Sequence, residues 1–125
     1  MQPNACRSDV LDRARRPAPP SDDAQALAAL LRALGDPTRL AIAAMLRRED
    51  EPLCVCHIEA RFALSQPTIS HHLRVLRDAG LATSERRGTW VYYALDRARL
   101  AAHPGLDALL ASVTPFAPTR SKCCP

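Results

Sequence analysis

Two helical segments separated by a very short turn constrain the fold of this chain more than any other feature. A short helix is expected over residues 55–62, and Ala63-Leu64 forms the turn. A longer helix is expected over residues 65–79, because Ser65 can cap its start and its apolar residues recur on one face. Gly80 is typical of the position just after a helix. This arrangement predicts a helix-turn-helix.

The residues that follow predict a β-hairpin. Residues 81–86 and 89–95 alternate in the manner of strands, and they are joined around Arg87-Gly88. Trp90 and Tyr92 share one face of the second strand, which is more typical of packing at the base of a hairpin than of stacking on nucleic-acid bases. A helix-turn-helix followed by a hairpin predicts a winged helix-turn-helix.

Further helices flank this unit. A first helix begins after Ser21 and ends at Gly35, a second begins at Asp36, and a last helical region spans residues 96–113 with a break at Pro104. We therefore expect a mainly α (α+β) chain with the order α-α-α-α-β-β-α. The first and last helices carry more apolar surface than one small core needs. They predict a homodimer, although both could instead pack within their own domain.

The length of 125 residues fits one domain with two tails. Residues 1–20 predict a disordered N-terminal arm, residues 21–113 the winged domain with its dimer contacts, and residues 114–125 a flexible C-terminal tail. A net charge of +4 permits nucleic-acid binding without showing it. No segment approaches the roughly 20 apolar residues of a membrane helix, and no signal peptide begins the chain. We expect a cytoplasmic protein that does not contact membranes.

Polar side chains on the segment 65–79 predict a helix that lies in the major groove of double-stranded DNA. At 100° per residue, His71 and Arg74 lie opposite the apolar stripe. Arginine can bind a guanine edge through two hydrogen bonds, and two arginines beside the hairpin glycine suit phosphate contacts. A merely solvated surface is the alternative. The candidate DNA contacts are Gln66, Thr68, Ser70, His71, Arg74, Arg86 and Arg87.

Two cysteines, Cys54 and Cys56, directly precede this region. They lie near a helix N-terminus, where partial positive charge lowers a thiol pKa. In a regular helix their side chains point about 200° apart, so they meet on one ion only if the helix start opens or if Cys54 precedes it. Thiolates prefer soft ions such as As(III), Cd(II), Pb(II) and Cu(I). A buried structural pair is the alternative, but Val55 and Ile58 are better core candidates.

Several ordered motifs resemble the ArsR/SmtB family of metal-responsive repressors. They are residues 34–40, 53–56, 64–73, 76–81 and 87–93. The resemblance covers roughly residues 22–113, and it is specific because several motifs share one register. It implies a homodimeric winged-helix repressor that binds operator DNA when metal-free. Binding of a metal or metalloid would then release the DNA and switch on resistance or efflux genes.

Two sulfurs are few for a tight site, so a third ligand is expected. The arsenite-sensing branch of the family has a Cys-x-Cys-x-x-Cys arrangement, but its third position is Glu59 here. Cys6 in the arm resembles arm cysteines that relatives bring to this motif, often across the dimer. The vicinal pair Cys123-Cys124 in the tail also suits trivalent arsenic. Both remain candidates for the third ligand.

We expect a repressor that senses trivalent arsenic and has no permanent cofactor. The same repressor answering cadmium or lead is one alternative, and a thiol redox switch is another. The family's other metal site is not expected, because Asp96, His103 and Asp107 lack its spacing. No nucleophile with a base, phosphate loop or acid pair is present, so no enzyme is expected.

The spacing of Cys54 and Cys56 also predicts a switch. Binding of As(III) by both sulfurs and a third one would unwind or shift the start of the short helix. Only Ala63-Leu64 separates that helix from the DNA-reading one, so the shift would change the spacing of the two reading heads in the dimer.

Overall fold

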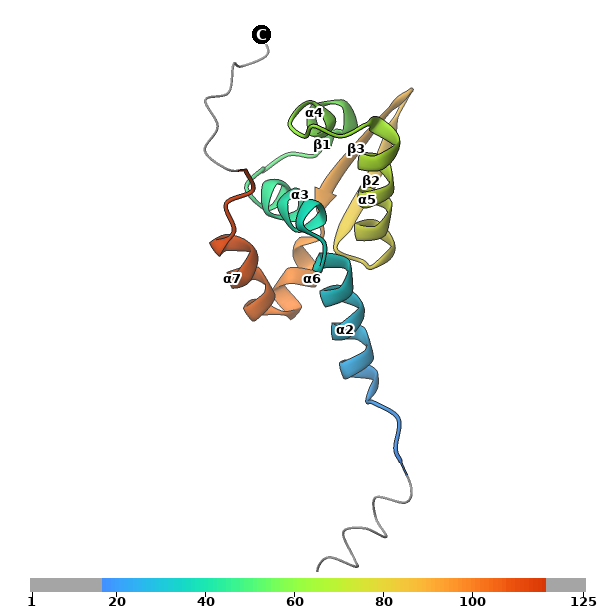
Figure 1. The fold of residues 1–125 in the computed structure, drawn as a ribbon, viewed down its shortest axis with the longest axis vertical. Coiled ribbons are helices and arrows are strands. Elements are labelled where there is room, and N and C mark those ends of the chain that lie inside the picture. Colours follow the sequence, from blue (N-terminus) through green and yellow to red (C-terminus); the bar gives the residue numbers. More distant parts are fainter. Residues whose placement is uncertain (1–16, 117–125) are drawn as a thin grey trace, which may run out of the picture.

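The computed structural model describes residues 17–116, so Cys6, Cys123 and Cys124 lie outside the described residues (Figure 1). The expectations for the arm and the tail fall largely outside them as well. The described elements are, in chain order, α2 (Asp22–Leu34), α3 (Pro37–Arg47), β1 (Leu53–Cys54), α4 (Val55–Ala60), α5 (Gln66–Asp78), β2 (Ala82–Arg87), β3 (Trp90–Leu95), α6 (Arg97–Ala102) and α7 (Pro104–Ser112).

The predicted winged helix-turn-helix is confirmed, because α4 and α5 are followed directly by the antiparallel hairpin β2–β3. The predicted element order needs two corrections. A two-residue strand, β1, pairs with β3 and makes a three-stranded sheet of order β1-β3-β2. The last helical region counts as two helices, α6 and α7. The predicted break at Pro104 is confirmed, because His103 leaves the helical conformation (φ −132°, ψ 75°) directly before it.

Side-chain caps fix several helix starts where the sequence predicts them. Ser21, Asp36 and Asp96 each accept a hydrogen bond from the backbone N–H three residues later, at 3.0–3.1 Å. Ser65 also occupies the N-cap position, but its hydroxyl bonds the Thr68 hydroxyl at 2.9 Å instead of a backbone N–H. The expectation that the Ser65 side chain caps α5 is therefore wrong.

The core joins all the described helices and the sheet. Its fully enclosed large side chains are Leu30, Ile42, Met45, Leu46, Ile58, Ile69, Leu73, Leu76, Leu81 and Leu110. Each contributes about 1.5–3 kcal/mol to stability. Ile69, Leu73 and Leu76 form the predicted apolar stripe of α5, so they fix the orientation of this helix. Figure 1 shows α5 beside the hairpin. The outer side of α5 faces away from α3.

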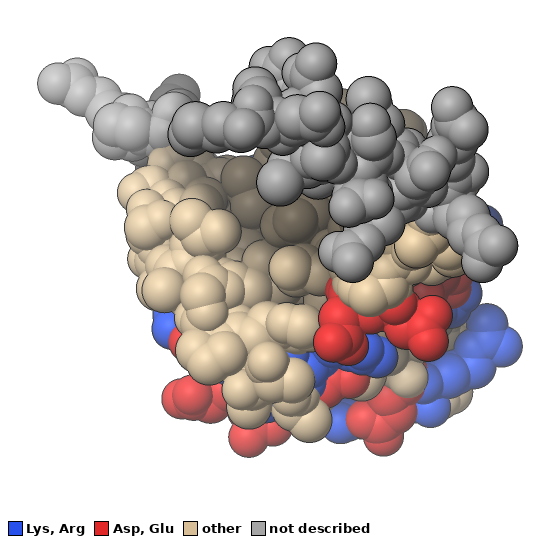
Figure 2. Space-filling view, turned by 90° about the horizontal axis from the view of Figure 1, so that it is seen from below, with Lys and Arg blue, Asp and Glu red and all other residues tan. Residues whose placement is uncertain are grey.

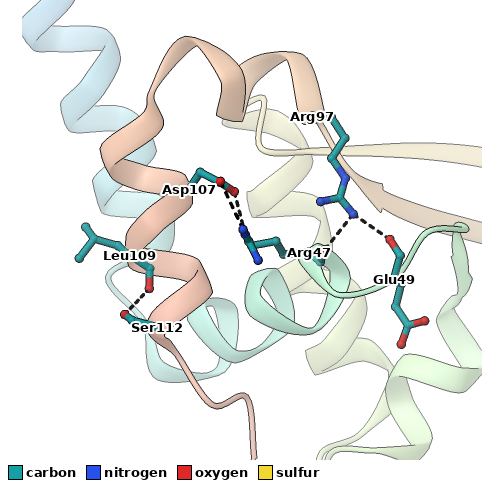
Figure 3. Close-up of polar contacts among 6 residues, drawn as sticks. All are labelled: Arg47, Glu49, Arg97, Asp107, Leu109 and Ser112. Carbon is teal, nitrogen blue, oxygen red and sulfur yellow. Dashed lines mark hydrogen bonds and ion pairs between the residues drawn. The ribbon is translucent and has the colours of Figure 1, made fainter.

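Arginines attach the C-terminal helices to α3 (Figure 3). Arg47 donates two hydrogen bonds to the Asp107 carboxylate, at 2.7 and 3.3 Å. Arg97 donates to the backbone oxygens of Arg47 and Glu49, at 2.9 and 2.8 Å. α7 is therefore held in a fixed position against the end of α3.

Leucines on α2 and α7 face away from this core. The exposed fractions are 38% for Leu27, 48% for Leu31 and 60% for Leu109. Figure 2 views the molecule from below, at the end of Figure 1 where α2 begins. Uncharged residues form a broad area on this side, next to a margin of mixed charge. None of the helices in residues 17–116 is long and apolar enough to span a membrane.

Candidate functional site

Cys54 and Cys56 lie at the junction of β1 and α4. Cys54 ends β1 and is the N-cap of α4 with extended backbone (φ −60°, ψ 141°), whereas Cys56 lies inside the helix. The Cys56 Sγ donates to the Cys54 Sγ at 2.7 Å. Cys54 thus precedes the helix, which is one of the two conditions for convergence. The sulfurs already lie close together while the helix start is closed, so their approach needs no unwinding. The shift of the helix start on ion binding stays a prediction.

The two thiols differ in exposure. Cys54 is 3% exposed, because the pairing of β1 with β3 places it opposite Tyr92 beneath the surface. Cys56 is exposed on the first turn of α4. The sequence favoured Val55 and Ile58 for the core, and only Ile58 is fully buried while Val55 is half-buried. Cys54 is therefore a fixed sulfur and Cys56 an accessible one.

The pKa of the Cys56 thiol is raised, contrary to the effect expected from a helix N-terminus. The main cause is its hydrogen bond to Cys54, and burial and the charge of Cys54 act in the same direction. The backbone N–H groups of His57 and Cys56 act in the opposite direction without prevailing. A soft ion must therefore displace a proton from this pair, which makes its binding depend on pH.

The predicted DNA-reading side chains of α5 lie on its outer face. Gln66, His71 and Arg74 are exposed, and Thr68 and Ser70 are half-buried.

His72, next to His71 on α5, instead packs inward, and its side chain is only 13% exposed. Its Nδ1 lies 3.4 Å from Arg39 and 3.9 Å from Asp36. The outward residues therefore leave an unobstructed polar surface along α5.

The hairpin presents Arg86 and Arg87 next to Gly88, whose φ of +64° suits the tight turn. Both arginines are exposed. Arg87 donates to Glu85 at 3.1 Å, and its guanidinium lies 4.6 Å from the centre of the Tyr92 ring. The Glu85 hydrogen bond also raises the pKa of Arg87. Arg87 is thus held along the strand, while Arg86 points into the groove described next.

A groove of about 380 Å³ lies between α4, α5 and the hairpin. We call it the thiol–arginine groove. The residues that matter for its chemistry are Cys54, Cys56, Glu59, Gln66, Ser70, Arg74, Arg77, Arg86 and Trp90. Both thiols and four of the predicted DNA contacts therefore open into one hollow, although the sequence presented them as separate sites.

Arg77, Glu59 and Trp90 are groove residues that the sequence did not select as site residues. For Arg77 a signal was available, because it lies three residues after Arg74 and so shares its side of α5. Glu59 and Trp90 come from other elements, so only the folded arrangement shows their proximity.

Two of the three residues considered for another metal site have structural roles. Asp96 caps α6, and Asp107 binds Arg47, which lowers the pKa of the Asp107 carboxyl. Across residues 17–116, no three or more His, Cys, Asp or Glu side chains are grouped so as to hold a metal ion. The thiol pair is thus a two-sulfur arrangement within the described residues, and its third ligand remains a prediction.

Comparisons with known proteins decide the family. Residues 36–84 match the family model described as "Bacterial regulatory protein, arsR family". The HTH-type transcriptional repressor SmtB of Mycobacterium tuberculosis is 40% identical over 98 residues, which cover 73% of this chain and 71% of that repressor. The chain belongs to the ArsR/SmtB family of DNA-binding transcriptional repressors.

The names of the relatives of this ArsR-family chain mention different elements. The arsenic resistance transcriptional regulator ArsR1 of Pseudomonas putida is 46% identical over 66 residues, covering 53% of this chain and 51% of that protein. The cadmium resistance regulatory protein CadC homolog of Staphylococcus aureus is 44% identical over 70 residues, covering 56% and 57%. The chain spans about half the length of these two regulators. Their similar identities do not distinguish arsenic from cadmium.

A solved structure supports the same assignment for this ArsR-family chain. HlyU from Vibrio cholerae has a TM-score of 0.63 and 30% identity, covering 75% of this chain and all of that one. The similarity extends beyond residues 36–84, to which the family model is confined. The winged fold is therefore common to both chains.

Proposed function

We propose that this protein is a cytoplasmic metalloid-responsive repressor. It binds operator DNA through α5 and the hairpin, and it dissociates when trivalent arsenic binds Cys54 and Cys56. The observation that supports this most is the convergence of the two sulfurs at 2.7 Å beside the arginines of α5 and the hairpin. Release of the operator would switch on resistance genes.

The active form in this proposal is a homodimer joined through α2 and α7. The exposed leucines Leu27, Leu31 and Leu109 supply apolar surface that the core does not use. The broad uncharged area in Figure 2 fits such a contact. A two-fold dimer would read an inverted repeat whose half-sites are spaced by about one helical turn or a multiple of it.

The thiol pair needs only a small adjustment to hold an ion. Two thiolates bound to one ion by bonds of about 2.3 Å lie roughly 3.4 Å apart on pyramidal As(III) and roughly 3.8 Å apart on a tetrahedral ion. The sulfurs of Cys54 and Cys56 are 2.7 Å apart, so one must move outward. The exposed Cys56 can rotate, whereas Cys54 is enclosed. Cys54 therefore anchors the ion and Cys56 closes on it.

The third ligand in this proposal comes from the tail of the same protomer. The Phe116 ring packs on Phe62, with centroids 5.0 Å apart, so the last described residue lies beside the end of α4. Cys123 follows seven residues later, a reach of roughly 25 Å when extended. Figure 1 shows α2 extending away from α4, so the first described residues lie far from the thiols. Cys6 remains the alternative, from the partner.

Arsenite titration against a bound operator duplex tests the proposal. Cys54→Ser and Cys56→Ser should keep DNA binding and lose the arsenite response. A Cys123→Ser/Cys124→Ser variant should respond weakly, whereas Cys6→Ser is the matched control and should respond normally. A Cys54→Ser/Cys56→Ser protein that still leaves its operator on arsenite addition would contradict the proposed site.

Two alternative inducers fit the same thiols. Cadmium or lead would act on the repressor in the same way, and the similarity to the CadC homolog favours including them. A redox switch is the other alternative, because the sulfurs are close enough to react with each other on oxidation. As(III), Cd(II), Pb(II) and peroxide are each titrated separately against the protein bound to DNA. The agent that releases the DNA at the lowest concentration is the inducer.

A further inference from the structure

We propose that Trp90 contacts the sugar–phosphate backbone of the operator when α5 and the hairpin bind DNA. The indole adds an apolar contact to the polar ones predicted from the sequence. This inference rests on the proposed docking of α5 and the hairpin, and it concerns a residue that the sequence pattern assigned to packing.

Trp90 is more exposed than its position in the sequence predicts. It shares one face of β3 with Tyr92, which favours packing at the base of the hairpin. Tyr92 is half-buried, but Trp90 is 56% exposed, so the packing expectation is wrong for Trp90. Isolated apolar side chains are common on protein surfaces. The surroundings of Trp90 therefore decide what it contacts.

The register of the hairpin places Trp90 at its tip. Trp90 is the first residue of β3, two residues after Gly88, and it lies opposite Arg87 of β2. Side chains of opposite residues share a face of the sheet. On this face Arg87 donates a hydrogen bond to Glu85 at 3.1 Å, and its guanidinium lies over the Tyr92 ring. Arg87 is thus directed toward the base of the hairpin, and the indole stays uncovered at the tip.

The charge around Trp90 indicates a polyanion as its partner. Trp90 lines the thiol–arginine groove, whose lining also includes three arginines, Arg74, Arg77 and Arg86. Within the described residues, Glu59 is the one acidic member of that lining. An apolar protein partner would bury these guanidinium groups without enough opposite charge, which costs free energy. The phosphates of DNA supply that charge, so this surface suits a duplex better than an apolar protein surface.

The structure of a duplex decides which of its parts an indole can meet. Paired bases are stacked on each other, so an intact duplex offers no free base face to Trp90. The deoxyribose carries apolar C–H groups on the outside of the duplex, and the neighbouring phosphates accept hydrogen bonds. The indole supplies a flat apolar surface and one N–H donor, which match these two features. The contact should thus add affinity without selecting a base sequence.

Fluorescence of the native chain tests the contact directly, because Trp90 is its only tryptophan. Acrylamide quenches an exposed indole on collision, so the quenching constant reports access to this side chain. The probe is a duplex that the native protein selects from a random pool. Saturation with this duplex should lower the quenching constant of Trp90 at least about 3-fold, because the sugar–phosphate backbone would cover the indole.

A matched control moves the tryptophan away from the hairpin. Ala98 is exposed on α6 and does not line the groove. The variant Trp90→Phe/Ala98→Trp therefore carries its single tryptophan at a site that the proposed contact does not cover. The duplex should leave the quenching constant of this variant nearly unchanged, whereas protection equal to that of Trp90 would overturn the inference.

The affinity change and its salt dependence separate this contact from a charged one. Trp90→Ala should weaken binding of the selected duplex about 10-fold, a loss typical of a tryptophan within an interface. A duplex of scrambled sequence should lose the same factor, because the contact does not read bases. The salt slope of the affinity should stay unchanged, whereas Arg86→Ala should reduce it by about one because a phosphate contact is lost. Trp90→Phe keeps an apolar ring, so it should lose less affinity than Trp90→Ala.

The outcomes distinguish this contact from the proposed function. Equal quenching of Trp90 in the free and the DNA-bound protein overturns the inference, and so does a Trp90→Ala protein that binds within about 2-fold of the native affinity. In both cases the proposed function stands, because the protein still binds DNA. A native chain that binds no duplex from the pool overturns the proposed function, and the inference with it. The quenching measurement uses the native chain, so it does not depend on the stability of any variant.

Discussion

The thiol–arginine groove and the α2/α7 face have opposite chemistry. The groove combines two sulfurs with Arg74, Arg77 and Arg86, and it is hollow. The α2/α7 face carries the exposed Leu27, Leu31 and Leu109, and the hydrogen bonds from Arg47 to Asp107 hold its helix α7 in place (Figure 3). In the proposed function, DNA reading and ion sensing therefore share one surface, and the contact between copies uses another. Changes on the two surfaces should have separable effects.

The largest expected effect is on the α2/α7 face. A Leu31→Glu/Leu109→Glu variant places charges where two copies are proposed to meet, so the dimer should dissociate. DNA affinity should fall by about 100-fold or more, because one half-site supplies only part of the binding free energy. Light scattering measures the mass and anisotropy the affinity. Leu64→Glu, at a leucine of similar exposure outside this face, should keep the dimeric mass. A dimeric Leu31→Glu/Leu109→Glu protein would contradict the division of surfaces.

The next effect is on the reading side of the groove. Arg74→Ala should cost about 1–3 kcal/mol of DNA binding, roughly 5–150-fold, and relax sequence preference if the arginine binds a base. Arg32→Ala removes an exposed arginine from α2 and should change affinity by less than about 2-fold. Competition against a pool of point-mutated duplexes measures both quantities. Equal effects of the two substitutions would show that α5 does not read the DNA.

A smaller effect concerns the sensing side. Cys54→Ala removes the main cause of the raised pKa of Cys56, so Cys56 should ionise at lower pH. Its alkylation by iodoacetamide at neutral pH should then be several-fold faster than in the native chain, because the thiolate is the reactive form. A Cys6→Ser/Cys123→Ser/Cys124→Ser background restricts the measurement to this site. The pH dependence of the rate gives the shift, and an unchanged rate profile would refute the coupling of the two thiols.

Most of the helix positions and faces could be predicted from patterns of residues close together in the sequence. The stripe of Ile69, Leu73 and Leu76 fixes both the inner face and the outer face of α5, since one helical period sets both. Gly80, with a φ of +83°, ends the turn after α5 where the sequence placed a helix stop. These features depend on residues close together in the chain, so no tertiary information is needed.

The features that the sequence did not predict depend on contacts between residues far apart in the chain. β1 consists of Leu53 and Cys54 alone, and it forms only because β3 lies alongside it. That pairing places Cys54 ahead of the helix, which decides how it meets Cys56. The shared groove likewise arises when α4, α5 and the hairpin pack together. Spacing along the sequence could not show that the thiols and the arginines face one hollow.

The smallest expected effect is on the support of the α2/α7 face. Asp107→Asn weakens the ion pair with Arg47, whose side chains are 28% and 40% exposed, so the loss of stability should be small. The hydrogen bond from Arg47 lowers the folded-state pKa of Asp107 below its ordinary value of 3.8. The pair therefore stabilises the fold above the unfolded-state pKa, and this contribution disappears as pH falls through the folded-state pKa. Urea unfolding of both proteins should show a difference at pH 7 that vanishes in acid. A difference that persists in acid would assign the effect to packing of α7 rather than to charge.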